Sequence, residues 1–162
     1  MASPAAPPIF HLLLMRVGIA GISGRVGRLL VLELEQAGIP IAGGIARNQP
    51  TTPSIDCPMF DGIGSLAAGC DVVIDFTHAD TVSTHAASLA DAGVAWVLGT
   101  TGLSPSDQAA VSHAAQRIPV VQAANFSPGV TLVTGLARLA AASLPAAAYD
   151  AEIVEMHHRQ KV

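Results

Sequence analysis

Charged residues are scarce in this sequence. Asp, Glu, Lys and Arg make up 12% of its 162 residues, whereas apolar residues make up 51%, and a typical soluble domain has about 25% charged residues. A parallel sheet covered on both faces would account for the deficit, because its strands are buried on both sides. A surface that a partner covers would account for it equally, so the composition leaves both explanations open.

Extended basic patches, paired cysteines and long apolar runs are also missing. The formal net charge is −4, and no Lys/Arg cluster of the kind that binds phosphodiester backbones occurs. This argues against nucleic acid as a partner, but not against a single nucleotide bound at a helix N-terminus. Cys57 and Cys70 form no C-x-x-C pair, so we expect free thiols rather than a disulfide or a metal site. No stretch predicts a membrane span, and we expect a cytoplasmic protein.

Residues 1–14 resemble an extension rather than a signal peptide. They contain no basic region and no clear cleavage site. We expect Met15 to be the natural start, because the first strand is expected one residue later.

Short apolar strands alternate with helices from residue 16 onward. Apolar runs bounded by glycine predict buried strands, and apolar residues at helical spacing predict helices. Ser104 followed by Pro105 predicts a helix start. The alternation predicts βαβ units and an α/β, Rossmann-like, doubly wound parallel sheet. The expected strands are 16–20, 39–46, 71–75, 94–98, 118–122 and 149–155, and the expected helices are 24–37, 79–92, 105–117 and 129–143.

A glycine-rich turn joins the first expected strand to the first helix. A tight turn here and a close approach to a pyrophosphate both require glycine. The helix N-terminus would add backbone amides and a positive dipole. A turn that binds nothing is the alternative, but the strand–turn–helix context favours a dinucleotide. The predicted pyrophosphate site consists of Gly21, Ile22, Ser23, Gly24, Arg25 and Val26.

The end of the second expected strand bears on the choice of cofactor. An acidic residue at this place binds the ribose hydroxyl of NADH, but the sequence there is Ile45-Ala46-Arg47-Asn48. The guanidinium of Arg47 would suit a 2′-phosphate. We therefore expect NADPH, with NADH kept as an alternative, and an ordinary solvated arginine is almost as well supported.

Three further turns follow expected strands. Asp75-Phe76-Thr77, Gly99-Thr100-Thr101-Gly102 and Ala123-Ala124-Asn125-Phe126 each stand where a parallel strand reaches its carboxyl end. Ligands of doubly wound sheets bind at that edge. Small and hydroxyl side chains would leave room for a flat ring there, although capped turns would have the same composition.

A cluster of basic side chains lies near the end of the sequence, in Glu155-Met156-His157-His158-Arg159-Gln160-Lys161. Cationic groups suit an anionic substrate, and histidine can act as a general acid near neutrality. A solvated basic tail is an equal alternative. Adjacent histidines on a strand point to opposite faces, so we expect no metal there. The other histidines, His11, His78, His85 and His113, are scattered, and we expect them to be structural or solvated.

Taken in order, these motifs resemble the dihydrodipicolinate reductase family of lysine and diaminopimelate biosynthesis. The set is Gly-x-x-Gly-Arg-x-Gly, Asp-Phe-Thr, Gly-Thr-Thr-Gly, Ala-Asn-Phe-Ser-x-Gly-Val and Glu-x-His-His-Arg-x-Lys. The resemblance runs from Met15 to Val162. It implies a nicotinamide cofactor that passes hydride to a small, cyclic, unsaturated dicarboxylate, and a homotetramer in full-length members.

The resemblance also implies residue roles. His157 matches the acid/base residue of the family, Lys161 its second proton donor and His158 a substrate contact. The nicotinamide would lie against Gly99, Thr100, Thr101, Ala123, Ala124, Asn125 and Phe126. Residues 15–130 would form the dinucleotide-binding domain. Residues 131–162 would begin an incomplete α+β substrate and tetramerisation domain, and Pro128 replaces an aliphatic residue of the family.

The family pattern continues beyond Lys161 with a carboxylate-binding loop and the strands of a mixed sheet. We therefore expect this chain alone to bind cofactor weakly or moderately and to have little reductase activity. A non-catalytic NADPH-binding module is the alternative. A short-chain dehydrogenase is excluded because Tyr149, the sole tyrosine, has Ile153 where lysine is needed, and the Gly-Lys-Ser/Thr of a P-loop is absent.

Overall fold

The structure is a computed structural model that describes residues 15–47, 57–144, 147–154 and 156. The chain forms two compact units, Met1–Ala124 and Asn125–Val162. Among the described residues, no helix has the length and apolarity needed to cross a membrane.

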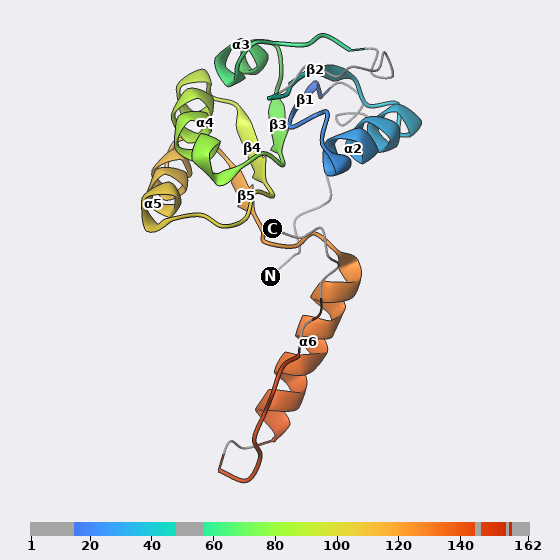
Figure 1. Cartoon of the computed structure of the whole chain (residues 1–162), viewed down its shortest axis with the longest axis vertical. Helices are drawn as coiled ribbons and strands as arrows, with labels where there is room; N and C mark the ends of the chain where they lie inside the picture. The colour runs from blue at the N-terminus through green and yellow to red at the C-terminus, as the bar shows by residue number, and fades with distance from the viewer. Residues whose placement is uncertain (1–14, 48–56, 145–146, 155, 157–162) are drawn as a thin grey trace, which may run out of the picture. The chain divides into compact units, whose positions relative to one another are not determined.

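The first unit is built on a five-stranded, all-parallel sheet of order β2-β1-β3-β4-β5 (Figure 1). This confirms the expected Rossmann-like class. The register places the strand ends level, because Ala20 pairs with both Ile45 and Asp75, and Leu98 pairs with both Asp75 and Gln122. The turns that follow therefore share one edge of the sheet. The strands are β1 (Val17–Ala20), β2 (Ile41–Ile45), β3 (Val72–Asp75), β4 (Ala95–Leu98) and β5 (Val120–Gln122).

Helices cover both faces of this sheet. Val17 and Ile19 of β1 pack with Val31 and Leu34 of α2 (Arg25–Gln36) on one face. The other face packs against three helices, α3 (Ile63–Ala67), α4 (Ala79–Ala92) and α5 (Pro105–Ala114), and Figure 1 shows the two groups on opposite sides. Because the strands are buried on both sides, few charged residues are needed.

The helix boundaries follow from their caps. Ser104 and Asp107 form the reciprocal capping box at the start of α5, with Pro105 in the first helical position. Gly93 ends α4 in the left-handed conformation, as expected. Helix α5 ends three residues earlier than predicted, because Gln116 and Arg117 donate to carbonyls three residues back and tighten the last turn.

Two features near β2 escaped the sequence analysis. Helix α3 has only five residues, follows Gly62 and contains Gly64, so its apolar residues are too few to show a helical period. The segment before it lies beside β2, where Gly44 N donates to Pro58 O and Phe60 N donates to Gly44 O, both at 2.9 Å. This segment brings Asp61 and Ile63 toward the carboxyl end of β2.

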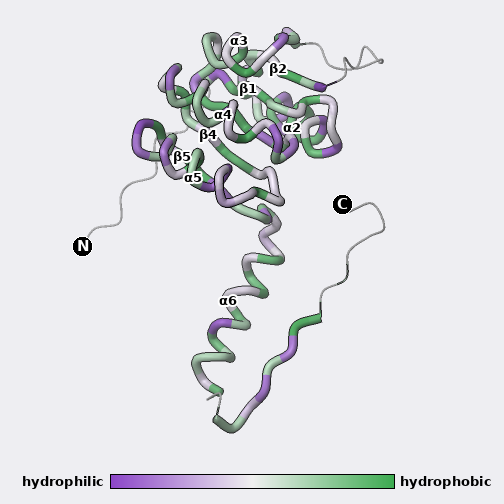
Figure 2. Tube along the Cα trace, turned by 60° about the vertical axis from the view of Figure 1, so that its left-hand side comes forward, coloured by the Kyte–Doolittle hydropathy of each residue, from purple (hydrophilic) through white to green (hydrophobic). Residues whose placement is uncertain are grey.

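The second unit contains α6 (Pro128–Ser143). Ser127 caps it by accepting a hydrogen bond from Val130 N, and Pro128 occupies the first turn, where its missing N–H costs nothing. Arg138 is its sole charged residue, and Figure 2 shows mostly apolar colours along it. The strand expected at 149–155 was wrong, because residues 149–154 form no strand. The described residues of this unit include no strand beside them with which to form a ladder.

Gly27 tests the packing of the first turn of α2. A Cβ atom there would lie 2.7 Å from both Cα and O of Ile22, and this backbone is fixed in the core. We expect Gly27→Ala to lower the free energy of unfolding by about 1–3 kcal/mol, measured by urea unfolding. Gly64→Ala in α3 is the matched control, because nothing lies within 4 Å of its Cβ position. Equal stability of the two variants would contradict this packing.

Candidate functional site

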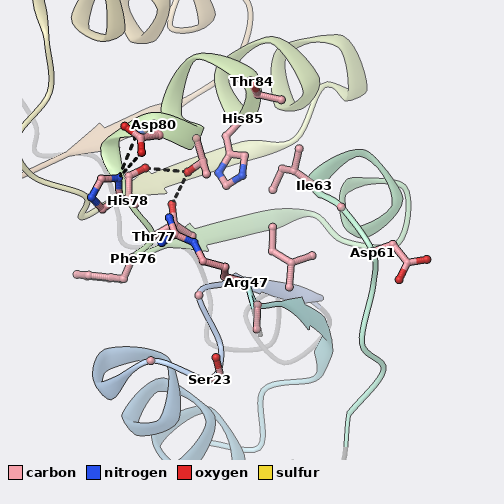
Figure 3. A pocket seen from close by; sticks show the side chains of 16 residues that line it. Ser23, Arg47, Asp61, Ile63, Phe76, Thr77, His78, Asp80, Thr84 and His85 are labelled. Atoms are coloured by element: carbon pink, nitrogen blue, oxygen red, sulfur yellow. Dashed lines mark hydrogen bonds and ion pairs between the residues drawn. The ribbon is translucent and has the colours of Figure 1, made fainter. Parts of the chain in front are cut away.

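A pocket of about 600 Å³ opens at the carboxyl edge of β1, β2 and β3. Four segments line it: the turn after β1, the end of β2, the start of α3 and the turn from β3 into α4 (Figure 3). The edge is the one at which ligands of doubly wound sheets bind. The lining residues are Gly21, Ser23, Gly24, Ile45, Ala46, Arg47, Asp61, Gly62, Ile63, Phe76, Thr77, His78, Asp80, Thr81, Thr84 and His85.

The glycine turn forms one wall of the pocket. Gly21 has φ +84°, and a Cβ atom there would lie 2.5 Å from the carbonyl oxygen of Phe76, so no larger residue fits. The amides of Gly21 and Ile22 both donate to Ile45 O, at 2.9 and 3.1 Å. These bonds join the turn after β1 to the end of β2.

The start of α2 faces this pocket through Gly24. This N-cap residue supplies no side-chain hydrogen bond, and the first turn of the helix has no acidic residue. The positive end of the helix dipole is therefore not offset by the helix itself, which suits an anionic ligand. Ser23 also lines the pocket, whereas Ile22 is buried in the core and Arg25 and Val26 lie outside the lining.

Arg47 brings positive charge to the same pocket. It follows β2, its side chain is exposed, and Figure 3 shows it extending toward the other lining side chains. It makes no hydrogen bond or ion pair within the described part of the chain. Asp61 also lines the pocket, but its carboxylate points away from the other side chains in Figure 3. The other lining carboxylate, Asp80, lies 3.1 Å from Nδ1 of His78.

A buried carboxylate supports the floor of the pocket. Asp75, at the end of β3, is fully buried. Its Oδ1 accepts hydrogen bonds from the amide and hydroxyl of Thr77, at 3.1 and 2.6 Å. Its Oδ2 accepts from the indole N–H of Trp96 at 3.3 Å and lies 2.7 Å from Nδ1 of His85. One side chain thus holds three elements, β3, β4 and α4.

The turn after β4 is joined to the turn after β3. Thr100 is buried, and its hydroxyl accepts from Thr77 N at 3.1 Å. Gly99 N donates to Asp75 O at 2.9 Å, and the ring of Phe76 fills the space where a Gly99 side chain would lie. The structure therefore brings these motifs together at one edge, while Gly99, Thr100 and Thr101 lie outside the lining of the pocket.

The remaining predicted residues lie elsewhere. Ala123 and Ala124 follow β5, the strand at the opposite edge of the sheet from β2. Asn125 and Phe126 belong to the second unit, where Asn125 Oδ1 accepts from Ser127 N at 2.7 Å. Three predicted residues, His157, His158 and Lys161, fall outside the described residues. In the described ranges, no group of three or more His, Cys, Asp or Glu could hold a metal ion.

His85 is one of the pocket residues that the sequence analysis missed. It was predicted to be structural or solvated, and it is indeed bonded to Asp75, but it also lines the pocket. A usable signal existed, because His85 lies three residues after Val82 and four before Leu89 on the apolar face of α4. A histidine on such a face needs a buried polar partner. Asp75, at the end of the preceding strand, could have been proposed as that partner.

The Asp75 cluster leads to a stability prediction. The amide of Thr77 and the indole N–H of Trp96 are donors on opposite oxygens. In Asp75→Asn the amide NH₂ must therefore face a donor whichever way it turns. We expect a loss of about 1–3 kcal/mol in the free energy of unfolding, measured by urea titration.

Asp91→Asn is the matched control for this prediction. Asp91 is paired with Arg117 at 2.7 Å, but its side chain is 72% exposed, so its loss should cost less than about 1 kcal/mol. Similar losses in the two variants would show that the buried cluster does not support the fold.

Comparisons with known proteins agree on one family. Residues 15–126 match the family described as dihydrodipicolinate reductase, N-terminus. The chain is 65% identical over 148 residues to a 4-hydroxy-tetrahydrodipicolinate reductase of Gluconacetobacter diazotrophicus, covering 91% of this chain and 56% of that protein. It is 52% identical over 149 residues to the enzyme of that name from Granulibacter bethesdensis, covering 91% and 57%.

Solved structures share the fold. A dipicolinate-bound dihydrodipicolinate reductase from Paenisporosarcina sp. TG-14 superposes with a TM-score of 0.70 at 25% identity, covering 79% of this chain and 54% of that one. A UDP-N-acetylglucosamine 3-dehydrogenase from Acidithiobacillus ferrooxidans, with a TM-score of 0.59 at 21% identity over 75% and 43% of the two chains, shares the fold. The chain spans little more than half the length of the curated relatives it matches. It belongs to the dihydrodipicolinate reductase family, and its residues 15–126 match the N-terminal part of that family.

Proposed function

We propose that this chain is the NADPH-binding part of a 4-hydroxy-tetrahydrodipicolinate reductase. The family implies a nicotinamide cofactor. The observation that supports NADPH is that the glycine turn and Arg47 line the same pocket. The turn offers a helix N-terminus to a pyrophosphate, and Arg47 offers a guanidinium to a 2′-phosphate.

The residues present fit this cofactor. Gly21 and Gly24 carry no side chain that would stand in front of the first turn of α2, so phosphate oxygens can approach the start of this helix closely. Ala46 supplies no carboxylate at the end of β2, and the carboxylate of Asp61 is directed away from the pocket (Figure 3). A ribose bearing a phosphate therefore meets positive rather than negative charge here.

The nicotinamide end is proposed from the family pattern. Gly99, Thr100, Thr101 and the segment 123–126 would line it. The hydrogen bond between Thr77 N and Thr100 Oγ1 supports this, because it fixes the turn after β4 against the turn after β3. Thr101 next to it is exposed at the same edge, where its hydroxyl and backbone can meet a ring.

In the proposed reaction 4-hydroxy-tetrahydrodipicolinate, a small cyclic dicarboxylate, loses its hydroxyl group as water, and the cofactor would supply the hydride that reduces the resulting unsaturated ring. His157 would donate the proton that quenches the charge developing in the substrate, with Lys161 as a second donor and His158 binding a carboxylate. Residues 15–130 would be the dinucleotide-binding domain and 131–162 the start of the substrate domain. A cytoplasmic homotetramer is the proposed state of the full-length enzyme.

A reductase assay separates this function from that of an NADPH-binding module without catalysis. The chain would be incubated with NADPH and substrate while the loss of NADPH absorbance is followed. Substrate-dependent loss would favour the enzyme. Tight NADPH binding without turnover, even after the family's remaining C-terminal part is supplied, would favour the module.

Arg47 gives the test of the cofactor. We expect Arg47→Gln to weaken NADPH binding about tenfold to a hundredfold, because a charge-assisted hydrogen bond to the 2′-phosphate is lost, and to change NADH binding less than about twofold. Isothermal titration calorimetry at fixed salt measures both affinities.

Arg117→Gln is the matched control for the Arg47 substitution. Arg117 follows α5, is paired with Asp91 and lies outside the pocket lining, so the variant should bind NADPH as the parent chain does. An equal loss of NADPH and NADH affinity in Arg47→Gln would show that Arg47 does not select the phosphate.

A further inference from the structure

His85 is 5% exposed and stands on the buried face of α4, yet it lines the pocket. Figure 3 shows its ring projecting from α4 toward the middle of the lining side chains. One ring nitrogen, Nδ1, lies 2.7 Å from Oδ2 of the fully buried Asp75. The other ring nitrogen, Nε2, is the atom that a ligand in the pocket could contact.

The hydrogen-bond network assigns the proton to Nδ1 of His85. Each oxygen of Asp75 already accepts from a group that can only donate, the amide of Thr77 on Oδ1 and the indole N–H of Trp96 on Oδ2. A carboxylate in this position acts as an acceptor, so His85 Nδ1–H donates to it. In the neutral ring Nε2 is then an acceptor.

Nε2 of His85 is accessible from the pocket. It has no hydrogen-bond partner in the described part of the chain. No buried side-chain nitrogen or oxygen of the described residues lacks a partner, so an unpartnered Nε2 must be exposed to the cavity. The walls around it contribute the apolar side chains of Ile45 and Ile63. A flat, mainly apolar group with one hydrogen-bond donor suits this wall.

We infer that Nε2 of His85 accepts a hydrogen bond from the 6-amino group of the adenine of the cofactor, so that the Asp75–His85 pair makes the pocket select adenine. This inference rests on the proposed function. If the glycine turn holds the pyrophosphate and Arg47 the 2′-phosphate, the base lies in the remaining part of the pocket, which Ile63, Thr84 and His85 line. Hypoxanthine has a carbonyl where adenine has its amino group. Its carbonyl oxygen would face Nε2 of His85, and because both atoms are acceptors no hydrogen bond could form.

The first experiment compares NADPH with its deamino analogue, the hypoxanthine dinucleotide, by calorimetry on the whole chain. We expect the parent chain to bind NADPH about tenfold more tightly than the analogue, the value of one hydrogen bond whose acceptor would otherwise be unmatched. Equal affinities would overturn the inference and leave the proposed function standing. Failure of NADPH itself to bind would contradict the proposed function.

His85→Asn isolates the contribution of Nε2. The amide nitrogen of asparagine can take the place of Nδ1 and keep the bond to Asp75, whereas the position of Nε2 is left empty. We expect the ratio of the two affinities to fall to within about twofold of one. His113→Asn on α5 is the matched control, because His113 is exposed and outside the pocket lining, and it should keep the parent ratio. If His85→Asn still preferred NADPH over the deamino analogue as strongly as the parent chain does, the inference would be overturned.

A second measurement needs no variant. Nitrogen-15 NMR of the parent chain at about pH 8.5, above the ordinary titration range of histidine, reports which ring nitrogen of each histidine carries a proton. We expect His85 to be protonated on Nδ1 alone, with the Nε2 resonance shifting when NADPH is added. A proton on Nε2 in the free chain would overturn the inference even if His85→Asn fails to fold.

Discussion

The buried carboxylate of Asp75 is the interaction on which the site depends. It ends β3, and its two oxygens receive donors from the turn after β3, from β4 and from α4. A buried carboxylate is costly unless its oxygens are satisfied, so the hydrogen bonds that Asp75 accepts stabilise the cluster only together. The positions of Thr77, Trp96 and His85 are therefore linked, and so is the shape of the pocket that two of them line.

The parallel register explains why this carboxylate stands beside a pocket at all. Ile45, Ala20, Asp75 and Leu98 are level across four strands, so the chain leaves each strand at the same edge. The glycine turn follows β1 and Arg47 follows β2 at this edge. Asp75 ends β3, and Thr100 lies in the turn after β4. A glycine turn, a guanidinium and a polar floor thus come together from segments almost 80 residues apart in the sequence, because the strands of a parallel sheet all end at the same edge.

The sequence predicted the parts of the fold that local pattern determines. The five strands of the sheet, the helix caps at Ser104 and Gly93 and the glycine turn all have signals within a few residues. What it missed depends on distant contacts. The strand expected at 149–155 had the right residues but no neighbour to pair with, and α3 is too short to show a period. The apolar face of α4 indicates that His85 needs a buried polar partner, but its place in the pocket depends on how β3 and α4 pack together.

The sole tryptophan offers the most direct test of the central claim, that the pocket above Asp75 is an NADPH site. Trp96 donates to Asp75, which also holds the pocket residue His85, so a nucleotide bound there lies within energy-transfer range of the indole. The measurement is a titration of the purified chain with NADPH, following the emission of Trp96 and of the nucleotide. We expect saturable loss of Trp96 emission with a matching rise in nucleotide emission. No transfer, in a sample that circular dichroism shows to be folded, would contradict it.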